Sequence, residues 1–191
     1  MSVLCLSALC LSGCAGRIGT AESATTATVV VGAPTQPGAA VGAVLAEIYA
    51  GVLARAGAPV RTAPDAGARP DYLAGLDAAQ LTLVPEQSVA LLHHLDPAAA
   101  PANEDDAYVM LNRSLPEGLS VSDPAALDLD GGGSLVPLFR TGALTEEQMR
   151  RLNLVAGELT SGELTALADE VAAGEVTPYD AAREWLDRHG M

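Results

Sequence analysis

The side chains that most often carry enzymatic chemistry are sparse in this 191-residue sequence. His93 and His94 are adjacent, and adjacent residues on a helix point about 100° apart, so these two do not chelate one metal ion together. No cysteine or acidic residue stands at a zinc-site spacing from them. Asp128-Leu-Asp-Gly-Gly-Gly133 begins like a calcium loop, but Gly132 and Phe139 stand where its fifth and twelfth ligands belong. We therefore predict a glycine turn at residues 128–133 and no metal site.

Composition and missing motifs exclude further classes of function. The sequence contains no Gly-x-Ser-x-Gly elbow, no phosphate-binding loop and no triad with a usable histidine, which predicts that the protein is not an enzyme and uses no cofactor. The formal net charge of -14 argues against nucleic acid, because phosphates require a basic face. The same charge is compatible with a cationic ligand or partner, although solubility alone explains an acidic surface equally well.

The amino-terminal segment resembles the export signal of a bacterial lipoprotein. Residues 2–12 form an apolar run far shorter than the ~20 residues that a membrane-spanning helix needs. The run ends at Leu11-Ser-Gly-Cys14, which resembles a lipobox; the alternative is a buried helix that ends in Gly-Cys. We expect a signal peptide over residues 1–13 and a lipidated Cys14 that begins a flexible tether over 14–27. The protein would then be exported and held at the outer face of the cell membrane by lipid alone.

The remaining polar loops lie where buried strands are predicted to end. Strands are predicted over residues 28–32, 59–64 and 80–85, with helices over 38–56 and around 72–76. Strand, helix and strand at this spacing form a crossover that sets the strands parallel. Sheets of this kind bind ligands at the carboxyl ends of their strands. Here those ends are the loops Gly32-Ala-Pro-Thr-Gln36 and Pro85-Glu-Gln-Ser88, so we expect any binding site there.

The rest of the chain is interpreted from apolar periodicity and helix-start signals. We predict a helix over 88–95, a connector over 98–106, a strand over 107–112, mostly loop over 115–133, and a short strand at a sheet edge over 135–139. The last third is predicted to be helical, because Thr145, Thr160 and Thr177 each open a helix-start pattern. Tyr49 and Trp185 lie on apolar helical stripes, so both are predicted to be core residues.

Several segments together resemble the substrate-binding proteins of glycine betaine/choline/osmoprotectant ABC transporters. Leu81-Thr-Leu-Val-Pro-Glu-Gln-Ser-Val89 stands where that family has a motif like Ile-Asp-Leu-Tyr-Pro-Glu-Tyr-Thr-Gly. The family's closing segment is matched by Leu135-Val-Pro-Leu138, by Leu144-Thr-Glu-Glu-Gln-Met-Arg-Arg-Leu-Asn153, and by Ala181-Ala-Arg-Glu-Trp-Leu186. The resemblance implies an α/β, periplasmic-binding-protein-like lobe over residues 28–190, with a parallel-rich sheet, flanking helices, and carboxyl-terminal helices packed back on the lobe.

The resemblance also implies a ligand, partners and site residues, with two departures. Family members close two lobes on a ligand, whereas here only residues 107–133 correspond to the second lobe, as a remnant. Val84 and Gln87 replace the motif's two tyrosines, although recognition of a quaternary ammonium rests on aromatic faces. The implied ligand is a quaternary-ammonium or other small cationic or zwitterionic solute, and the implied partners are ABC permease subunits. The implied site residues are Glu86 as counter-charge, with Gln36, Gln87 and Tyr108 lining a half-site.

Two functions from different classes remain as hypotheses. The first is a transport receptor: a lipoprotein that hands a small cationic or zwitterionic solute to a permease. The second is an interaction or scaffold module: a shortened single lobe without ligand binding.

Overall fold

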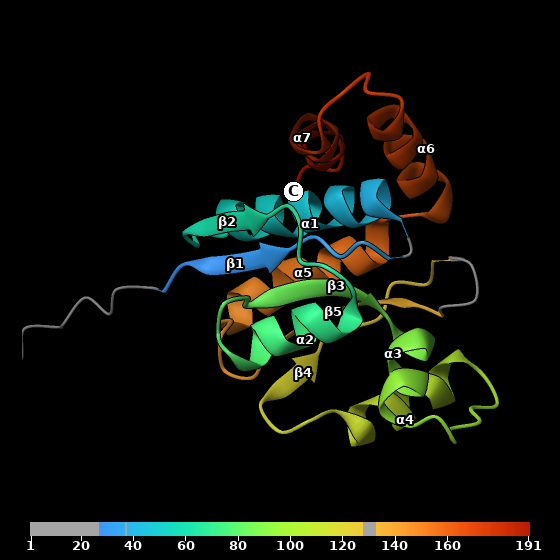
Figure 1. Ribbon diagram of the computed structural model, residues 1–191. Helices are drawn as coiled ribbons and strands as arrows, with labels where there is room; N and C mark the ends of the chain where they lie inside the picture. The colour runs from blue at the N-terminus through green and yellow to red at the C-terminus, as the bar shows by residue number, and fades with distance from the viewer. Residues whose placement is uncertain (1–26, 37, 128–132) are drawn as a thin grey trace, which may run out of the picture.

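Three parallel strands open the sheet, as the sequence predicts. The computed structural model describes residues 27–36, 38–127 and 133–191. In it, β1 (Val29–Gly32) lies between β2 (Val60–Ala63) and β3 (Leu83–Gln87) and is parallel to both. The crossover from β1 to β2 is α1 (Ala39–Arg55), and the crossover from β2 to β3 is α2 (Arg69–Asp77) (Figure 1). The carboxyl ends of β1 and β3 therefore share one edge of the sheet.

Two antiparallel strands complete a mixed sheet. The strand β5 (Leu135–Arg140) runs antiparallel to β3, and β4 (Leu119–Val121) runs antiparallel to β5. The order is β2-β1-β3-β5-β4, so β2 and β4 are the two edge strands. The sequence predicts a short edge strand over 135–139. The structure instead places β5 inside the sheet, where a run buried on both faces belongs.

Side chains of alternate residues along the strands contribute to two separate hydrophobic cores. Val29 and Val31 point to the face covered by α1, whereas Val30 points to the face covered by α2. The same alternation continues in β5, where Leu135 and Phe139 contact one core and Val136 and Leu138 contact the other. This period of two is what a buried strand imposes on its side chains.

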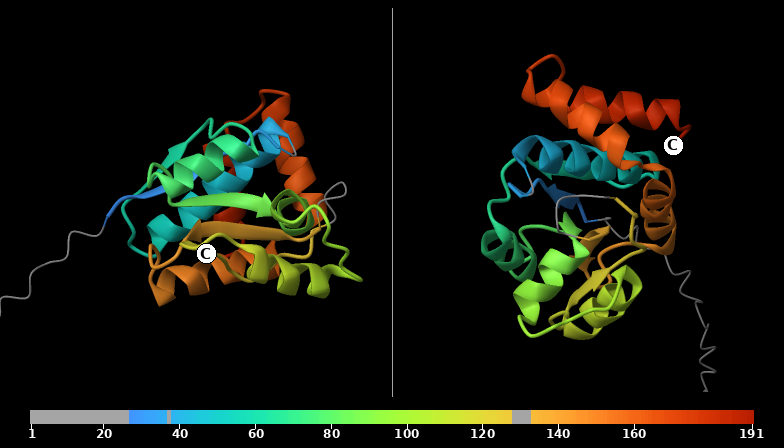
Figure 2. Two further views of the ribbon diagram at one scale, coloured as in Figure 1. Left: turned by 60° about the horizontal axis from the view of Figure 1, so that its bottom comes forward. Right: turned by 90° about the vertical axis from the view of Figure 1, so that its right-hand side faces the viewer.

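The helices form layers on both faces of the sheet (Figures 1 and 2). One core holds α2, α3 (Ser88–Leu95) and α4 (Glu104–Ser114), and the other holds α1 and α5 (Glu146–Glu158). The last two helices, α6 (Ser161–Ala172) and α7 (Pro178–Arg188), pack on the outer side of α1. The carboxyl-terminal helices thus pack back on the first lobe, as predicted.

The cap and core predictions for these helices are confirmed. The hydroxyls of Thr145, Thr160 and Thr177 accept backbone N–H groups three residues later at 3.3, 3.3 and 3.1 Å. These bonds satisfy N–H groups that a helix start leaves unpaired. Tyr49 is 1% exposed and Trp185 is 0% exposed, so both are core residues.

The predicted strand over residues 107–112 is wrong, because this segment belongs to α4. The Asn103 side chain accepts the backbone N–H of Asp106 at 2.8 Å and caps the helix. Three acidic residues, Glu104 to Asp106, then fill the first turn, where the helix dipole favours negative charge. Ala107 and Leu111, four residues apart, are buried against α3 and the sheet. The helix therefore begins within residues 98–106, for which the sequence predicts a connector.

The strand β4 was not predicted by the sequence. Its three residues follow Gly118, whose φ of +86° supplies a turn that other residues rarely adopt. Such a short strand has too few residues to show a period of two. Together, α4 and β4 place residues 104–121 on the same sheet and core as the rest of the fold.

The predicted signal peptide, Cys14, the predicted tether up to residue 26 and most of the predicted glycine turn (128–132) lie outside the described residues. Within the described ranges, no helix combines the length and apolar character needed to cross a membrane. The same ranges hold no cluster of three or more histidine, cysteine or acidic side chains suited to a metal ion.

Candidate binding site

Several strands end, and two helices begin, at the carboxyl edge of the parallel strands. The strands β1 and β3 end there; α3 begins directly after β3, and α1 begins after the short loop that follows β1. The strand β4 is antiparallel to β5 and hence points the same way as β3, so its carboxyl end also faces this edge. Two helix amino termini carry unpaired N–H groups and a partial positive charge toward this edge. The arrangement favours an anionic or hydrogen-bond-accepting group.

Glu86 lies in β3 and is held by a buried polar network. Its side chain is 4% exposed and accepts two hydrogen bonds from the Arg69 guanidinium, Nε at 2.9 Å and Nη2 at 3.0 Å. The Tyr72 hydroxyl donates to the same carboxylate, and the backbone N–H of Gln87 donates to Oε1 at 2.7 Å. The carboxylate is therefore fully engaged by groups of the protein itself.

This network shifts the titration of its two partners. Burial and the neighbouring Glu86 carboxylate raise the pKa of the Tyr72 phenol well above its usual range. The hydrogen bond to Glu86 also raises the pKa of Arg69 above its usual value. Both shifts keep Tyr72 neutral and Arg69 charged throughout the physiological range. The Glu86 charge is thus matched by Arg69 and is not free to serve as the counter-charge that the sequence predicted.

Gln87 and Ser88 are buried at this edge, and each has a side-chain atom without a hydrogen-bond partner among the described residues. Gln87 is 7% exposed and Ser88 is 0% exposed. Among the described residues, neither Gln87 Nε2 nor Ser88 Oγ has a hydrogen-bond partner. A buried polar group without a partner costs about 1–3 kcal/mol, so such groups need an explanation. Their place at the carboxyl end of a parallel strand makes them the best candidates for ligand contacts.

Two glycines let the backbone close tightly around this edge. A Cβ on Gly42 would lie 1.9 Å from the carbonyl oxygen of Pro34, so the loop after β1 rests directly on α1. A Cβ on Gly133 would lie 2.8 Å from Ser88 Oγ and 2.5 Å from a methyl group of Val89. A larger residue at Gly42 would displace the loop at Pro34, and one at Gly133 would press on Ser88 and Val89.

The other two predicted site residues, Gln36 and Tyr108, lie near this edge on different elements. Gln36 is exposed in the loop between β1 and α1. Tyr108 lies on α4, where its hydroxyl donates to the carbonyl oxygen of Ser122, just after β4, at 3.3 Å. The structure places all four predicted residues toward one edge, but Glu86 and Gln87 are neighbours on a strand and point to opposite faces.

The aromatic residues do not form a cage at this edge. The chain has one Trp, four Tyr and one Phe, and all six are described. Tyr49, Tyr72, Phe139 and Trp185 are buried in the cores, and Tyr179 lies on α7. Only Tyr108 is both near the edge and partly exposed. A cation could therefore contact at most one aromatic face from the described residues.

Sequence reasoning missed two contributors to this site, Arg69 and Tyr72. Arg69 and Tyr72 are three residues apart on α2 and therefore share a helix face. That spacing, opposite an isolated Glu86 in a buried strand, is a signal from which the network could have been inferred. Ser88 lies in the segment 85–88 where the sequence predicts a loop of the site, but the structure continues β3 to Gln87 and begins α3 at Ser88. Its burial depends on how α3 and the backbone at Ser134 meet.

Comparisons with known proteins establish the fold. No family model matches the sequence, and no curated protein matches it. Among solved structures, the chain is similar to ligand-free YehZ from Escherichia coli, with a TM-score of 0.73 and 13% sequence identity. The match covers 86% of this chain and 99% of that one. The α/β fold, with a five-stranded mixed sheet flanked by helices, is thus that of a periplasmic-binding-protein-like lobe.

Proposed function

We propose that this protein is the solute-binding component of an ABC transporter of the glycine betaine/choline type. It would be an exported lipoprotein, anchored at Cys14, that passes a small solute to permease subunits and carries out no catalysis. The binding-protein-like fold supports this role. The observation that carries it is the pair of buried polar groups, Gln87 Nε2 and Ser88 Oγ, at the carboxyl end of β3, which have no hydrogen-bond partner among the described residues.

The polar groups at this edge favour a solute with a carboxylate. Gln87 Nε2 is a donor, Ser88 Oγ can donate, and the amino termini of α1 and α3 present further N–H groups. The acidic group nearby, Glu86, is already engaged by Arg69. A zwitterion such as glycine betaine offers an acceptor for these donors, whereas choline offers only a hydroxyl and a cation. Carboxylate-bearing betaines are therefore the expected ligands.

The affinity is expected to be low. One partly exposed aromatic face contributes only about 0.5–1 kcal/mol to binding of a quaternary ammonium. A few hydrogen bonds to the carboxylate must then offset the entropy of association. The dissociation constant of glycine betaine should consequently be millimolar or weaker.

Ligand-dependent melting tests the proposal at two concentrations. At about 100 μM, glycine betaine, choline, carnitine and proline betaine should not change the melting temperature, whereas a ligand with a dissociation constant of about 1 μM would add roughly 2.7 kcal/mol. At tens of millimolar, glycine betaine should stabilise the wild type more than the Gln87→Leu variant. Because the general osmolyte effect of glycine betaine acts on both proteins, the difference between them reports binding at the site. A clear shift at the lower concentration would contradict the low-affinity site.

The second candidate is a lipid-anchored interaction or scaffold module that binds no solute. Two observations favour it: the Glu86 charge is neutralised within the protein, and four of the six aromatic side chains are built into the cores. Equal stabilisation of wild type and Gln87→Leu by every solute would support this alternative and contradict the receptor.

The membrane anchor is tested separately. Metabolic labelling with an alkyne fatty acid should tag the wild-type protein and not the Cys14→Ala variant, because Leu11-Ser-Gly-Cys14 has the order of a lipobox. Cys10→Ala is the matched control and should be labelled like the wild type. Equal labelling of wild type and Cys14→Ala would remove the lipid anchor from the proposal.

A further inference from the structure

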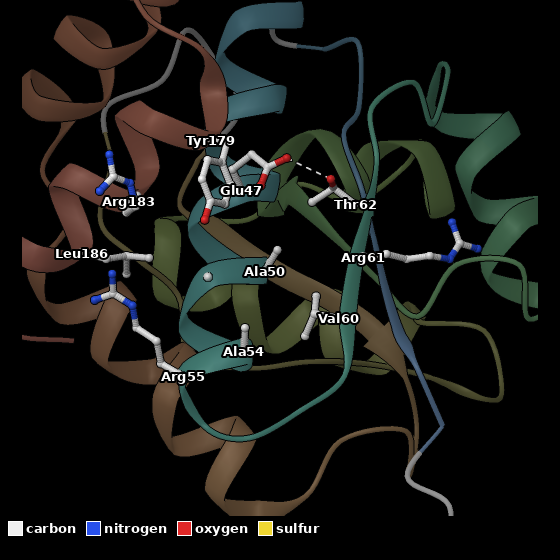
Figure 3. A pocket seen from close by; sticks show the side chains of 11 residues that line it. Glu47, Ala50, Ala54, Arg55, Val60, Arg61, Thr62, Tyr179, Arg183 and Leu186 are labelled. Atoms are coloured by element: carbon white, nitrogen blue, oxygen red, sulfur yellow. Dashed lines mark hydrogen bonds between the residues drawn. The ribbon is translucent and has the colours of Figure 1, made fainter.

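A groove of about 510 Å³ runs beside the edge strand β2, between β2, α1 and α7 (Figure 3). Its floor is the small-residue face of α1, formed by Ala50, Gly51 and Ala54. Val60 lines it from β2, and Leu186 lines it from α7. The volume lies in the range of binding sites for small or extended ligands. None of these residues belongs to the site at the strand ends.

The groove opens along a strand edge that has unpaired backbone groups. The strand β2 pairs only with β1, and no other described strand lies beside its outer edge. The carbonyl groups of Pro59 and Ala63 accept N–H groups of Val29 and Ala33 at 2.8 and 2.9 Å, so they face β1. Because backbone groups of successive residues alternate in direction, Val60 and Thr62 direct theirs to the open edge. The prolines at 59 and 64 occupy neither position, so the two outward N–H donors remain.

Glu47 is a carboxylate that lines the groove without an ion-pair partner among the described residues. The Glu47 carboxylate accepts a hydrogen bond from the Thr62 hydroxyl at 2.8 Å and forms no ion pair with a described residue. Two arginines that line the groove are already paired, Arg55 of α1 with Asp187 and Arg183 of α7 with Asp180. Arg61 also lines the groove, but Figure 3 shows its side chain pointing away from Glu47 and Tyr179. A basic group in the groove would therefore find Glu47 available.

Tyr179 adds an aromatic face at the same place. It is 61% exposed on α7 and lines the groove with Glu47. Aromatic faces attract cations, and a carboxylate beside one strengthens that preference. An exposed tyrosine over an apolar floor is also typical of protein–protein contacts.

We infer that this groove binds an extended peptide segment of a partner protein, which adds to the open edge of β2 and places one Lys or Arg side chain against Glu47 and Tyr179. Strand addition uses the backbone groups of Val60 and Thr62 for affinity, and alternate side chains of the peptide enter the groove for specificity. The two peptide residues that flank the basic residue point away from the groove. The peptide residues one position further on either side reach the floor formed by Ala50, Gly51 and Ala54. This interaction is independent of solute binding at the strand ends.

The probe is the peptide acetyl-Val-Thr-Lys-Thr-Val-amide, whose valines and lysine share one side. Titrated into the full chain and followed by ¹H–¹⁵N NMR, it should shift backbone amides of β2, α1 and α7. It should bind at least about tenfold more tightly than the same peptide with Glu in place of Lys. Glu47→Gln should remove most of that preference, whereas Glu170→Gln, on the exposed side of α6, should preserve it.

Two further probes distinguish strand addition from binding of a basic side chain alone. Methylation of the peptide nitrogens that face β2 should weaken binding at least about tenfold, because the added strand loses its donors. n-Butylamine should bind much more weakly than the lysine peptide. Equal binding of the Lys and Glu peptides, unchanged binding after methylation, or butylamine binding as tightly as the peptide would each overturn the inference.

Discussion

Replacing Trp185 by alanine should lower the free energy of unfolding by about 3–5 kcal/mol. The indole is 0% exposed and lies on the α7 face that packs against α1, together with Ala181, Ala182 and Leu186. His189 stacks on its ring, with 4.3 Å between the ring centroids. Alanine would leave a large cavity at the contact that holds the last helix to the fold. Urea unfolding followed by far-UV circular dichroism gives the change directly.

Tyr179→Ala is the matched control on the same helix. Its ring is 61% exposed, so its loss should change stability by less than about 0.5 kcal/mol. Native fluorescence should also be that of a buried indole. A Trp185→Ala variant that melts like the wild type, or emission from a fully solvated indole, would contradict the packing of α7 on α1.

The second large effect is expected at Arg69. Arg69→Ala should lower the free energy of unfolding by about 3–5 kcal/mol, because it leaves the Glu86 carboxylate buried without its cation. The guanidinium side chain is 16% exposed and the carboxylate is 4% exposed, so water compensates little. Equilibrium unfolding in urea at neutral pH provides the measurement.

Two comparisons make this result specific. The double variant Arg69→Met/Glu86→Leu should recover most of the lost stability, because it removes both charges and retains the volume. Arg150→Ala, which breaks an exposed pair with Glu147 on α5, should have little measurable effect. If Arg69→Ala were no more destabilising than Arg150→Ala, the buried network around Glu86 would be refuted.

Local patterns predicted much of the fold. The βαβ spacing established the three parallel strands, and Thr145, Thr160 and Thr177 marked the starts of the last three helices. These features depend on neighbouring residues alone, so they are visible in the sequence. The sequence predicts a strand over residues 107–112 because Tyr, Val and Met suit a strand as well as a helix, whereas the structure has α4 there. The decisive signal was the Asn103 cap followed by three acidic residues.

The place of β5 required information that the sequence does not contain. Whether an apolar strand lies at an edge or inside a sheet depends on what pairs with its second side, and β4 has only three residues.

The location of the candidate site could be predicted from the sequence, but the contacts within it could not. Its location at the carboxyl ends of β1 and β3 follows from topology. The engagement of Glu86 by Arg69 and Tyr72 follows from tertiary packing of α2.

The most direct test of the proposed solute site compares glycine betaine titrations of the wild type and the Gln87→Leu variant by ¹H–¹⁵N NMR. In the wild type, the side-chain amide of Gln87 and the backbone amides of Thr35 and Ser88 should shift with a millimolar dissociation constant. Choline should shift them far less, and Gln87→Leu should remove the response while its spectrum stays that of a folded protein. Wild-type signals at this edge that do not move, or equal responses in wild type and Gln87→Leu, would contradict a solute site at the end of β3.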